Sequence, residues 1–167
     1  MSEDDLVTAS RPRSMRQEST LLSAPPLLCD EALAPVQPTA TCTLGTHLES
    51  VKTSRDFTRV TLGLWGMSML ADVAELVVSE LVTNALRHGV PSARRIASDR
   101  CVRLRLLAQA PFVMCMVADP GRGIPVLQDS DLASESGRGL TVVEACCVRW
   151  GWHLLDGGGK IVWALLR

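Results

Sequence analysis

The stretch ELVVSELVTNALRHG, from Glu75 to Gly89, decides how this chain is interpreted. Its apolar residues recur at helical spacing, and a glycine and a proline then mark an end, so the sequence predicts a helix over residues 68–89. Glu80, Asn84 and His88 follow one another at spacings of four, which places them along one side of that helix. The rest of the sequence has to explain this row of a carboxylate, an amide and an imidazole.

A rotation of about 100° per residue divides this helix into two arcs. The arc that we expect to face solvent holds Asp72, Glu75, Ser79, Thr83 and Arg87. The buried arc holds Asn84 and His88 among Val73, Val77 and Leu81, with Glu80 at its margin. Taken singly, each polar residue is typical of a satisfied core group. An unpaired buried amide costs roughly 1–3 kcal/mol against a domain stability of about 5–15 kcal/mol, so the row as a whole favours a ligand cavity.

Composition narrows the class of protein. The chain has 167 residues, 47% of them hydrophobic, and a formal net charge of −1, which fits one domain and gives no electrostatic footprint for nucleic acid. The acidic start is not that of a signal peptide, and no apolar run is long enough to span a membrane. The six cysteines include no CxxC pair. We therefore expect a cytoplasmic protein with reduced thiols and no cysteine-bound metal.

The chain divides into a tail and a domain. Residues 1–42 hold five of the nine prolines and no sustained periodicity, so we predict a disordered tail there and a single domain over residues 43–167.

The order of predicted elements indicates the fold class. We expect a strand within residues 40–48, helices over 48–66 and 68–89, two strands joined by a turn at Ala110–Pro111, a helix over 139–150, and a hairpin over 150–167. The first helix is predicted from the spacing of Leu48, Val51, Phe57, Val60 and Leu64. Helices and strand pairs in this order predict an α+β fold, a two-layer α/β sandwich whose mixed, mostly antiparallel sheet is covered by helices on one face.

Two glycine-rich loops supply further candidate site residues. Asp119 ends a strand and is followed by Gly121 and Gly123, so its carboxylate can accept a hydrogen bond from an exocyclic amine while a flat ring approaches the backbone. An ordinary Asp-Pro-Gly turn is the alternative. The second loop, GRGL at residues 137–140, opens a helix whose free N–H groups suit phosphates, although many helices simply start with glycine.

Together, ELVVSELVTNALRHG, VADPGRGIP, SGRGLTVVEACCVRWGW and GGGKIVWALL resemble the Bergerat-fold ATP-binding domains shared by gyrase, MutL and histidine kinases. The resemblance covers about residues 45–167. Within these domains the chain is most similar to the single-domain, RsbW-like anti-sigma-factor serine/threonine kinases, in the form common in actinobacteria. The resemblance implies a protein kinase that uses ATP and Mg²⁺.

The resemblance also implies a role for each motif. Asn84 would coordinate Mg²⁺, and Glu80 would act as general base or orient the attacking hydroxyl, with Arg87 and His88 near the phosphates. Asp119 would bind the adenine amino group. The residues that would shape the ring pocket are Gly121, Gly123 and Ile124, and those that would close over the phosphates are Gly137, Arg138, Gly139 and Leu140. Lys160 stands where the family often has a threonine that helps to hold adenine.

The implied partners are an anti-anti-sigma protein as substrate and a sigma factor, and a homodimer is expected because family members commonly pair. A non-catalytic module that binds ATP or sequesters a partner is the alternative. The catalytic half of a two-component histidine kinase is disfavoured, because no upstream helix with a phospho-accepting histidine is recognisable.

Overall fold

The computed structural model describes residues 37–89, 101–126 and 138–167. Its elements follow the predicted order: β1 (Thr39–Leu44), α1 (Glu49–Leu64), the 3-10 turn η1 (Ser68–Leu70), α2 (Ala71–Asn84), the π-helical turn η2 (Ala85–Gly89), β2 (Val102–Gln109), β3 (Phe112–Asp119), α3 (Gly139–Cys146), β4 (Arg149–Leu154) and β5 (Lys160–Leu166). Strand β1 begins N-terminal to the expected domain start at residue 43. The predicted disordered tail lies almost wholly outside the described residues and stays a prediction.

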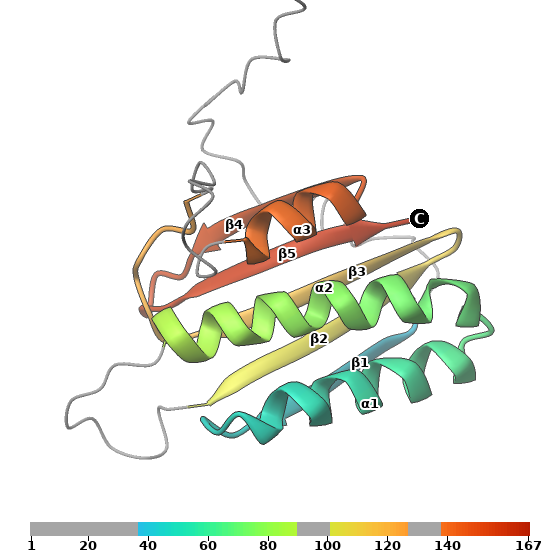
Figure 1. The fold of residues 1–167 in the computed structure, drawn as a ribbon, viewed down its shortest axis with the longest axis horizontal. Coiled ribbons are helices and arrows are strands. Elements are labelled where there is room, and N and C mark those ends of the chain that lie inside the picture. The colour runs from blue at the N-terminus through green and yellow to red at the C-terminus, as the bar shows by residue number, and fades with distance from the viewer. Residues whose placement is uncertain (1–36, 90–100, 127–137) are drawn as a thin grey trace, which may run out of the picture.

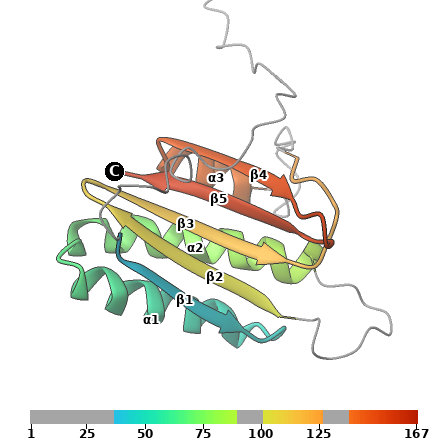
Figure 2. The same cartoon turned by 180° about the vertical axis from the view of Figure 1, so that it is seen from behind.

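The strands form one five-stranded sheet in the order β1-β2-β3-β5-β4. All four pairings are antiparallel, which confirms the predicted α+β sandwich and makes the described sheet wholly antiparallel. Seen from behind, the sheet lies in front of the helices (Figure 2). The register of β3 and β5 places Asp119 directly opposite Lys160. Directly opposed residues project from the same face of a sheet, so these two side chains start as neighbours.

The helices cover one face of the sheet, with α2 across its middle, α1 over the β1 side and α3 over the β4–β5 side (Figure 1). The core lies between the two layers, because strands and α2 contribute apolar residues to one cluster. Alternate β3 residues Val113, Cys115 and Val117 are buried in that cluster, and Asp119 continues the same alternation at the end of the strand. The sandwich therefore points Asp119 toward the helical layer.

Helix α1 forms as predicted, but most of the residues whose spacing predicted it do not face the core. Leu48, Val60 and Leu64 are 77%, 62% and 82% exposed. The inner face instead carries a hydroxyl row, Ser50, Ser54, Thr58 and Thr61, all buried. Small side chains let α1 approach the neighbouring elements closely. Three of the hydroxyls donate to backbone carbonyls: Ser50 to Gly45 (2.8 Å), Ser54 to Val51 (2.7 Å) and Thr58 to Ser54 (2.7 Å).

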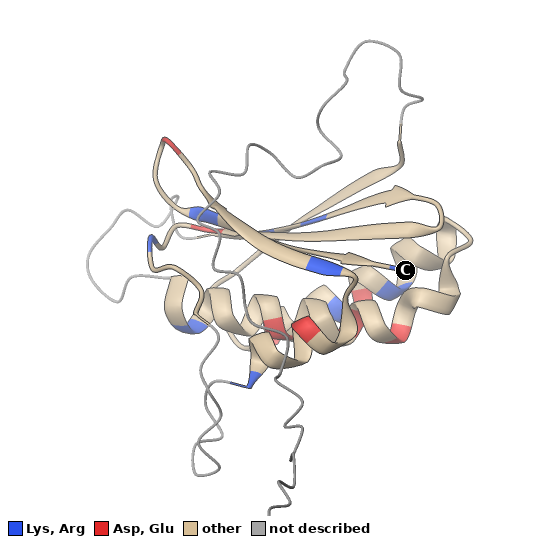
Figure 3. Cartoon of the chain, turned by 90° about the horizontal axis from the view of Figure 1, so that it is seen from above, with Lys and Arg blue, Asp and Glu red and all other residues tan. Residues whose placement is uncertain are grey.

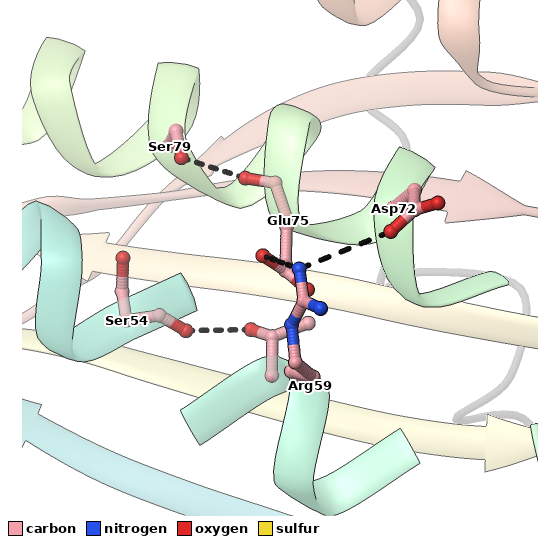
Figure 4. Close-up of polar contacts among 6 residues, drawn as sticks. Ser54, Arg59, Asp72, Glu75 and Ser79 are labelled. Carbon is pink, nitrogen blue, oxygen red and sulfur yellow. Dashed lines mark hydrogen bonds and ion pairs between the residues drawn. The ribbon is translucent and has the colours of Figure 1, made fainter. Parts of the chain in front are cut away.

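An ion pair joins α1 to α2. Arg59 approaches Glu75 with its Nε 2.7 Å from Oε1 and its Nη2 3.0 Å from Oε2, and Asp72 lies at 3.9 Å from the same guanidinium (Figure 4). The Glu75 side chain is only 13% exposed, whereas that of Asp72 is 97% exposed. The prediction that Glu75 belongs to a solvated arc is therefore wrong, because the neighbouring helix α1 covers this side of α2.

Acidic and basic residues both lie along the helical layer (Figure 3).

The C-terminal third differs from the prediction at one boundary. Helix α3 ends at Cys146, and Arg149 and Trp150 belong to β4, so the predicted helix over 139–150 is too long. The hairpin β4–β5 is confirmed. Its turn needs glycine, because Gly158 and Gly159 have φ values of 96° and 93°.

The described cysteines are free thiols, as predicted: Cys42, Cys101, Cys115, Cys146 and Cys147. Burial raises the pKa of Cys115 to about 12, and burial with the neighbouring Cys146 raises the pKa of Cys147 to about 11. Both thiols therefore stay protonated at neutral pH and behave as small apolar side chains.

Candidate functional site

The second half of α2 carries part of the predicted polar row. Glu80 and Asn84 lie one turn apart and are both partly buried. The π-helical turn η2 follows, and in it Arg87 and His88 are exposed. A π-helical turn is wider than an α-helical one, so the rotation of about 100° per residue no longer applies beyond Asn84. The prediction that His88 lies on the buried side is wrong for this reason, and the solvent-facing position of Arg87 is confirmed.

The start of α3 lies against Glu80 and Asn84. A methyl group added to Gly139 would lie 2.7 Å from Oε2 of Glu80 and 3.4 and 3.5 Å from Nδ2 and Oδ1 of Asn84. A side chain at this position would push Glu80 and the start of α3 apart, because real Cβ contacts are essentially never shorter than 3.0 Å. No side chain caps the helix at Arg138, which is exposed, and Leu140 anchors the first turn in the core. The start of α3, whose first N–H groups have no partner within the helix, thus lies close to the α2 carboxylate and amide.

Asp119 lies at the other end of the site and is buried, with 4% of its surface exposed. The Gly121 N–H donates to its Oδ1 at 2.8 Å, and the Lys160 ammonium donates to the same oxygen at 2.8 Å. Lys160 also approaches the Gly121 carbonyl at 3.5 Å. The carboxylate is therefore held in one orientation by a backbone donor and a buried cation.

Glycines surround Asp119 on three sides. A methyl group on Gly89 would clash with the Asp119 carboxylate, and one on Gly121 would lie 2.6 Å from the Gly89 Cα. One on Gly159 would lie 2.5 Å from the Asp119 carbonyl oxygen. The end of η2, the loop after β3 and the turn before β5 thus meet at this carboxylate, and each approaches it through backbone.

The remaining predicted residues are placed less closely. Gly123 has no atom within 4 Å of where its Cβ would be, and Ile124 is 54% exposed, so neither packs against Asp119 in the described part of the chain. Gly137 lies outside the described residues.

Helix α2 and its extension η2 connect the two halves of the site. Glu80 contacts the start of α3, and Gly89, at the end of η2, contacts Asp119. Glu80 and Asn84 at one end and Asp119 at the other therefore lie along α2 and its extension η2.

Sequence reasoning missed two contributions to this site. Gly89 was interpreted only as a helix end, yet its backbone packs on Asp119. The sequence shows Lys160 only as a departure from the family pattern, whereas the structure buries its side chain beside Asp119. In the sequence, the local signal for this contact is a lysine at the first position of an apolar strand. Its partner Asp119 lies 41 positions away along the chain, so local spacing does not connect the two residues.

The described residues contain no cluster of three or more His, Cys, Asp or Glu side chains that could hold a metal ion by themselves. Among the helices of those same residues, none has the length and hydrophobicity needed to cross a membrane.

Comparison with known proteins identifies the family of the domain. A family model, described as the histidine kinase-like ATPase domain, matches residues 45–165, which is most of the chain. No curated protein matches the sequence. The matched range includes both walls of the site, from α2 through the α3 start to Lys160. The chain therefore belongs to the histidine kinase-like ATPase domains, which are ATP-binding modules.

Proposed function

We propose that this protein is an ATP-dependent serine/threonine protein kinase. The observation that carries the proposal is the contact between Gly139, at the start of α3, and the side chains of Glu80 and Asn84. It brings a candidate general base, a candidate metal ligand and the free N–H groups of a helix start into one place. Phosphoryl transfer depends on this combination, because catalysis there is mostly positioning and neutralisation of charge.

The residues present fit Mg²⁺–ATP. Asp119 offers a fixed carboxylate for the adenine amine. The Asn84 side-chain oxygen is the type of ligand that Mg²⁺ accepts when the substrate phosphates supply others. The bound ion would supply charge neutralisation on the phosphates. Arg138 is exposed at the phosphate end and adds a positive charge there.

The proton transfer falls to Glu80. In the proposed reaction a partner's hydroxyl oxygen bonds to the γ-phosphorus, the bond to the β–γ bridging oxygen breaks, and ADP leaves. Glu80 accepts the hydroxyl proton or holds the hydroxyl in line, at the side of the site that faces Gly139. Asn84, one turn further on, holds the phosphate end in place.

By its resemblance, the proposed substrate is an anti-anti-sigma protein, and the regulated partner is a sigma factor bound elsewhere on the surface. The chain would work as a homodimer that switches between these partners. A non-catalytic module that binds ATP and sequesters a partner is the second candidate. Glu80 and Asn84 together favour the kinase, because a module that only binds has no need of a base.

A transfer assay tests the proposal. Purified protein is incubated with γ-labelled ATP, Mg²⁺ and an anti-anti-sigma protein, and label is followed into the partner. We expect acid-stable phosphoserine or phosphothreonine, and we expect EDTA to abolish its formation. ATP binding without transfer would support the non-catalytic module, whereas acid-labile label would indicate phosphohistidine and contradict the proposal.

A further inference from the structure

Lys160 is a buried cation at the base end of the site. It starts β5 opposite Asp119, and the side chains of the two residues are 6% and 1% exposed. Both project from the sheet face that the helices cover, because Val162 and Ala164 continue that face of β5 into the core. The lysine ammonium therefore lies inside the site rather than on the surface.

Stability alone gives a weak reason for such a pair. Desolvation of two charges offsets most of their attraction, and apolar replacements for buried ion pairs are often neutral or stabilising. The sheet register already fixes β3 against β5 through a full set of antiparallel pairings, so the ion pair is not needed to set it. A role in binding would explain why two charged residues are kept in this position.

Among the described residues, the hydrogen bonds of Lys160 and Asp119 leave one N–H donor of the ammonium and one oxygen of the carboxylate without a partner. Both hydrogen bonds that described residues make with Asp119 go to Oδ1, and the described residues make none with Oδ2. The ammonium has three N–H donors, of which one is used by Asp119 and a second points at the distant Gly121 carbonyl. An acceptor next to a donor is complementary to the edge of adenine, which presents an amine beside the ring nitrogen N1.

We propose that Lys160 is a specificity-determining residue that donates a hydrogen bond to N1 of adenine while Asp119 accepts one from the exocyclic amine. The inference rests on the proposed ATP site and adds a second base-reading group to it.

The test uses an analogue in which a C–H group replaces N1. Affinities of the wild-type protein for ATP and for 1-deaza-ATP are measured by calorimetry in Mg²⁺ buffer. We expect 1-deaza-ATP to bind about tenfold to a hundredfold more weakly, since hydrogen bonds to charged groups are among the stronger ones. Lys160→Met should discriminate less than about twofold between the two nucleotides. Lys52→Met, which changes an exposed lysine of α1, should keep the wild-type ratio.

The outcomes separate the inference from the function on which it rests. Equal binding of ATP and 1-deaza-ATP by the wild type overturns the role of Lys160 and leaves the ATP site standing. Undiminished discrimination by Lys160→Met, or tighter binding of GTP than of ATP, also overturns it. If neither adenine nucleotide binds, both the proposed function and the inference fall. The wild-type comparison decides the matter even if Lys160→Met does not fold.

Discussion

Helices α1 and α2 each turn polar side chains toward the interior, and the two rows differ in how these groups are satisfied. The α1 hydroxyls of Ser50, Ser54 and Thr58 donate to backbone carbonyls at 2.7–2.8 Å. In the part of the chain that the structure describes, Glu80 and Asn84 have no comparable hydrogen bond, and they face the start of α3 instead. Polar groups that are satisfied locally are structural, whereas groups that are left available belong to a site.

The first prediction concerns the α2 row. Glu80→Gln keeps the size of the side chain and removes the proposed base. We expect phosphoryl transfer to fall by about a hundredfold or more, because general bases contribute roughly 10²–10⁴-fold. ATP affinity and thermal stability should hardly change. Glu144→Gln, an exposed site on α3, is the matched control and should keep full activity in the same transfer assay. Transfer that survives in Glu80→Gln would contradict the assignment.

The second test fills the space between α2 and α3. Gly139→Ala introduces a methyl group 2.7 Å from the Glu80 carboxylate, which pushes the Glu80 side chain and the start of α3 apart. We expect ATP affinity to fall about tenfold, which corresponds to about 1.4 kcal/mol. Gly157→Ala is the control, because nothing lies within 4 Å of the added methyl group. Equal affinities of the two variants would mean that the α3 start does not contact the nucleotide.

The third test addresses the α1 row. Ser54→Ala removes the donor to the Val51 carbonyl and leaves the helix packing in place. We expect the free energy of unfolding in urea to fall by about 1 kcal/mol, the usual net value of one hydrogen bond. ATP affinity should stay at the wild-type value. A loss of nucleotide binding in this variant would show that the α1 hydroxyls take part in the site.

The smallest expected effect concerns the buried thiol of Cys115. Unlike the α1 hydroxyls, this core group is tolerated because it stays uncharged at neutral pH. Its pKa is raised from an ordinary value of 9.0 to about 12, so at alkaline pH the unfolded chain loses a proton that the folded chain keeps. Stability is then fully present below pH 9 and falls as the pH rises toward 12. Between pH 7 and 9.5 we expect the free energy of unfolding of Cys115→Val to fall by up to about 1 kcal/mol less than that of the wild type.

Urea unfolding of both proteins at the two pH values measures this difference. The baseline cost of the substitution cancels, because each protein is compared with itself. Identical losses in the two proteins would mean that the thiol ionises as readily in the folded state as in the unfolded chain.

The sequence was sufficient for the fold class because periodicity reports how each segment is buried. Alternation predicted β2, a continuous apolar run predicted β3, and the apolar spacing of residues 68–89 predicted α2. Periodicity predicted the wrong buried side at two places in the helices. The apolar spacing in α1 does not identify the buried face, because small hydroxyl residues face the core instead. The rotation of about 100° per residue placed His88 on the wrong side, because the π-helical turn changes the rotation per residue.

The sequence by itself determined the candidate groups of the site: a carboxylate and an amide one helical turn apart, an aspartate at a strand end, and glycine at a helix start. These are local patterns, and local spacing fixes them. Only the tertiary structure decided which of them meet. The contacts of Gly139 with Glu80, of Gly89 with Asp119 and of Lys160 with Asp119 join segments far apart in the chain. Such contacts depend on sheet register and layer packing, which local spacing in the sequence does not encode.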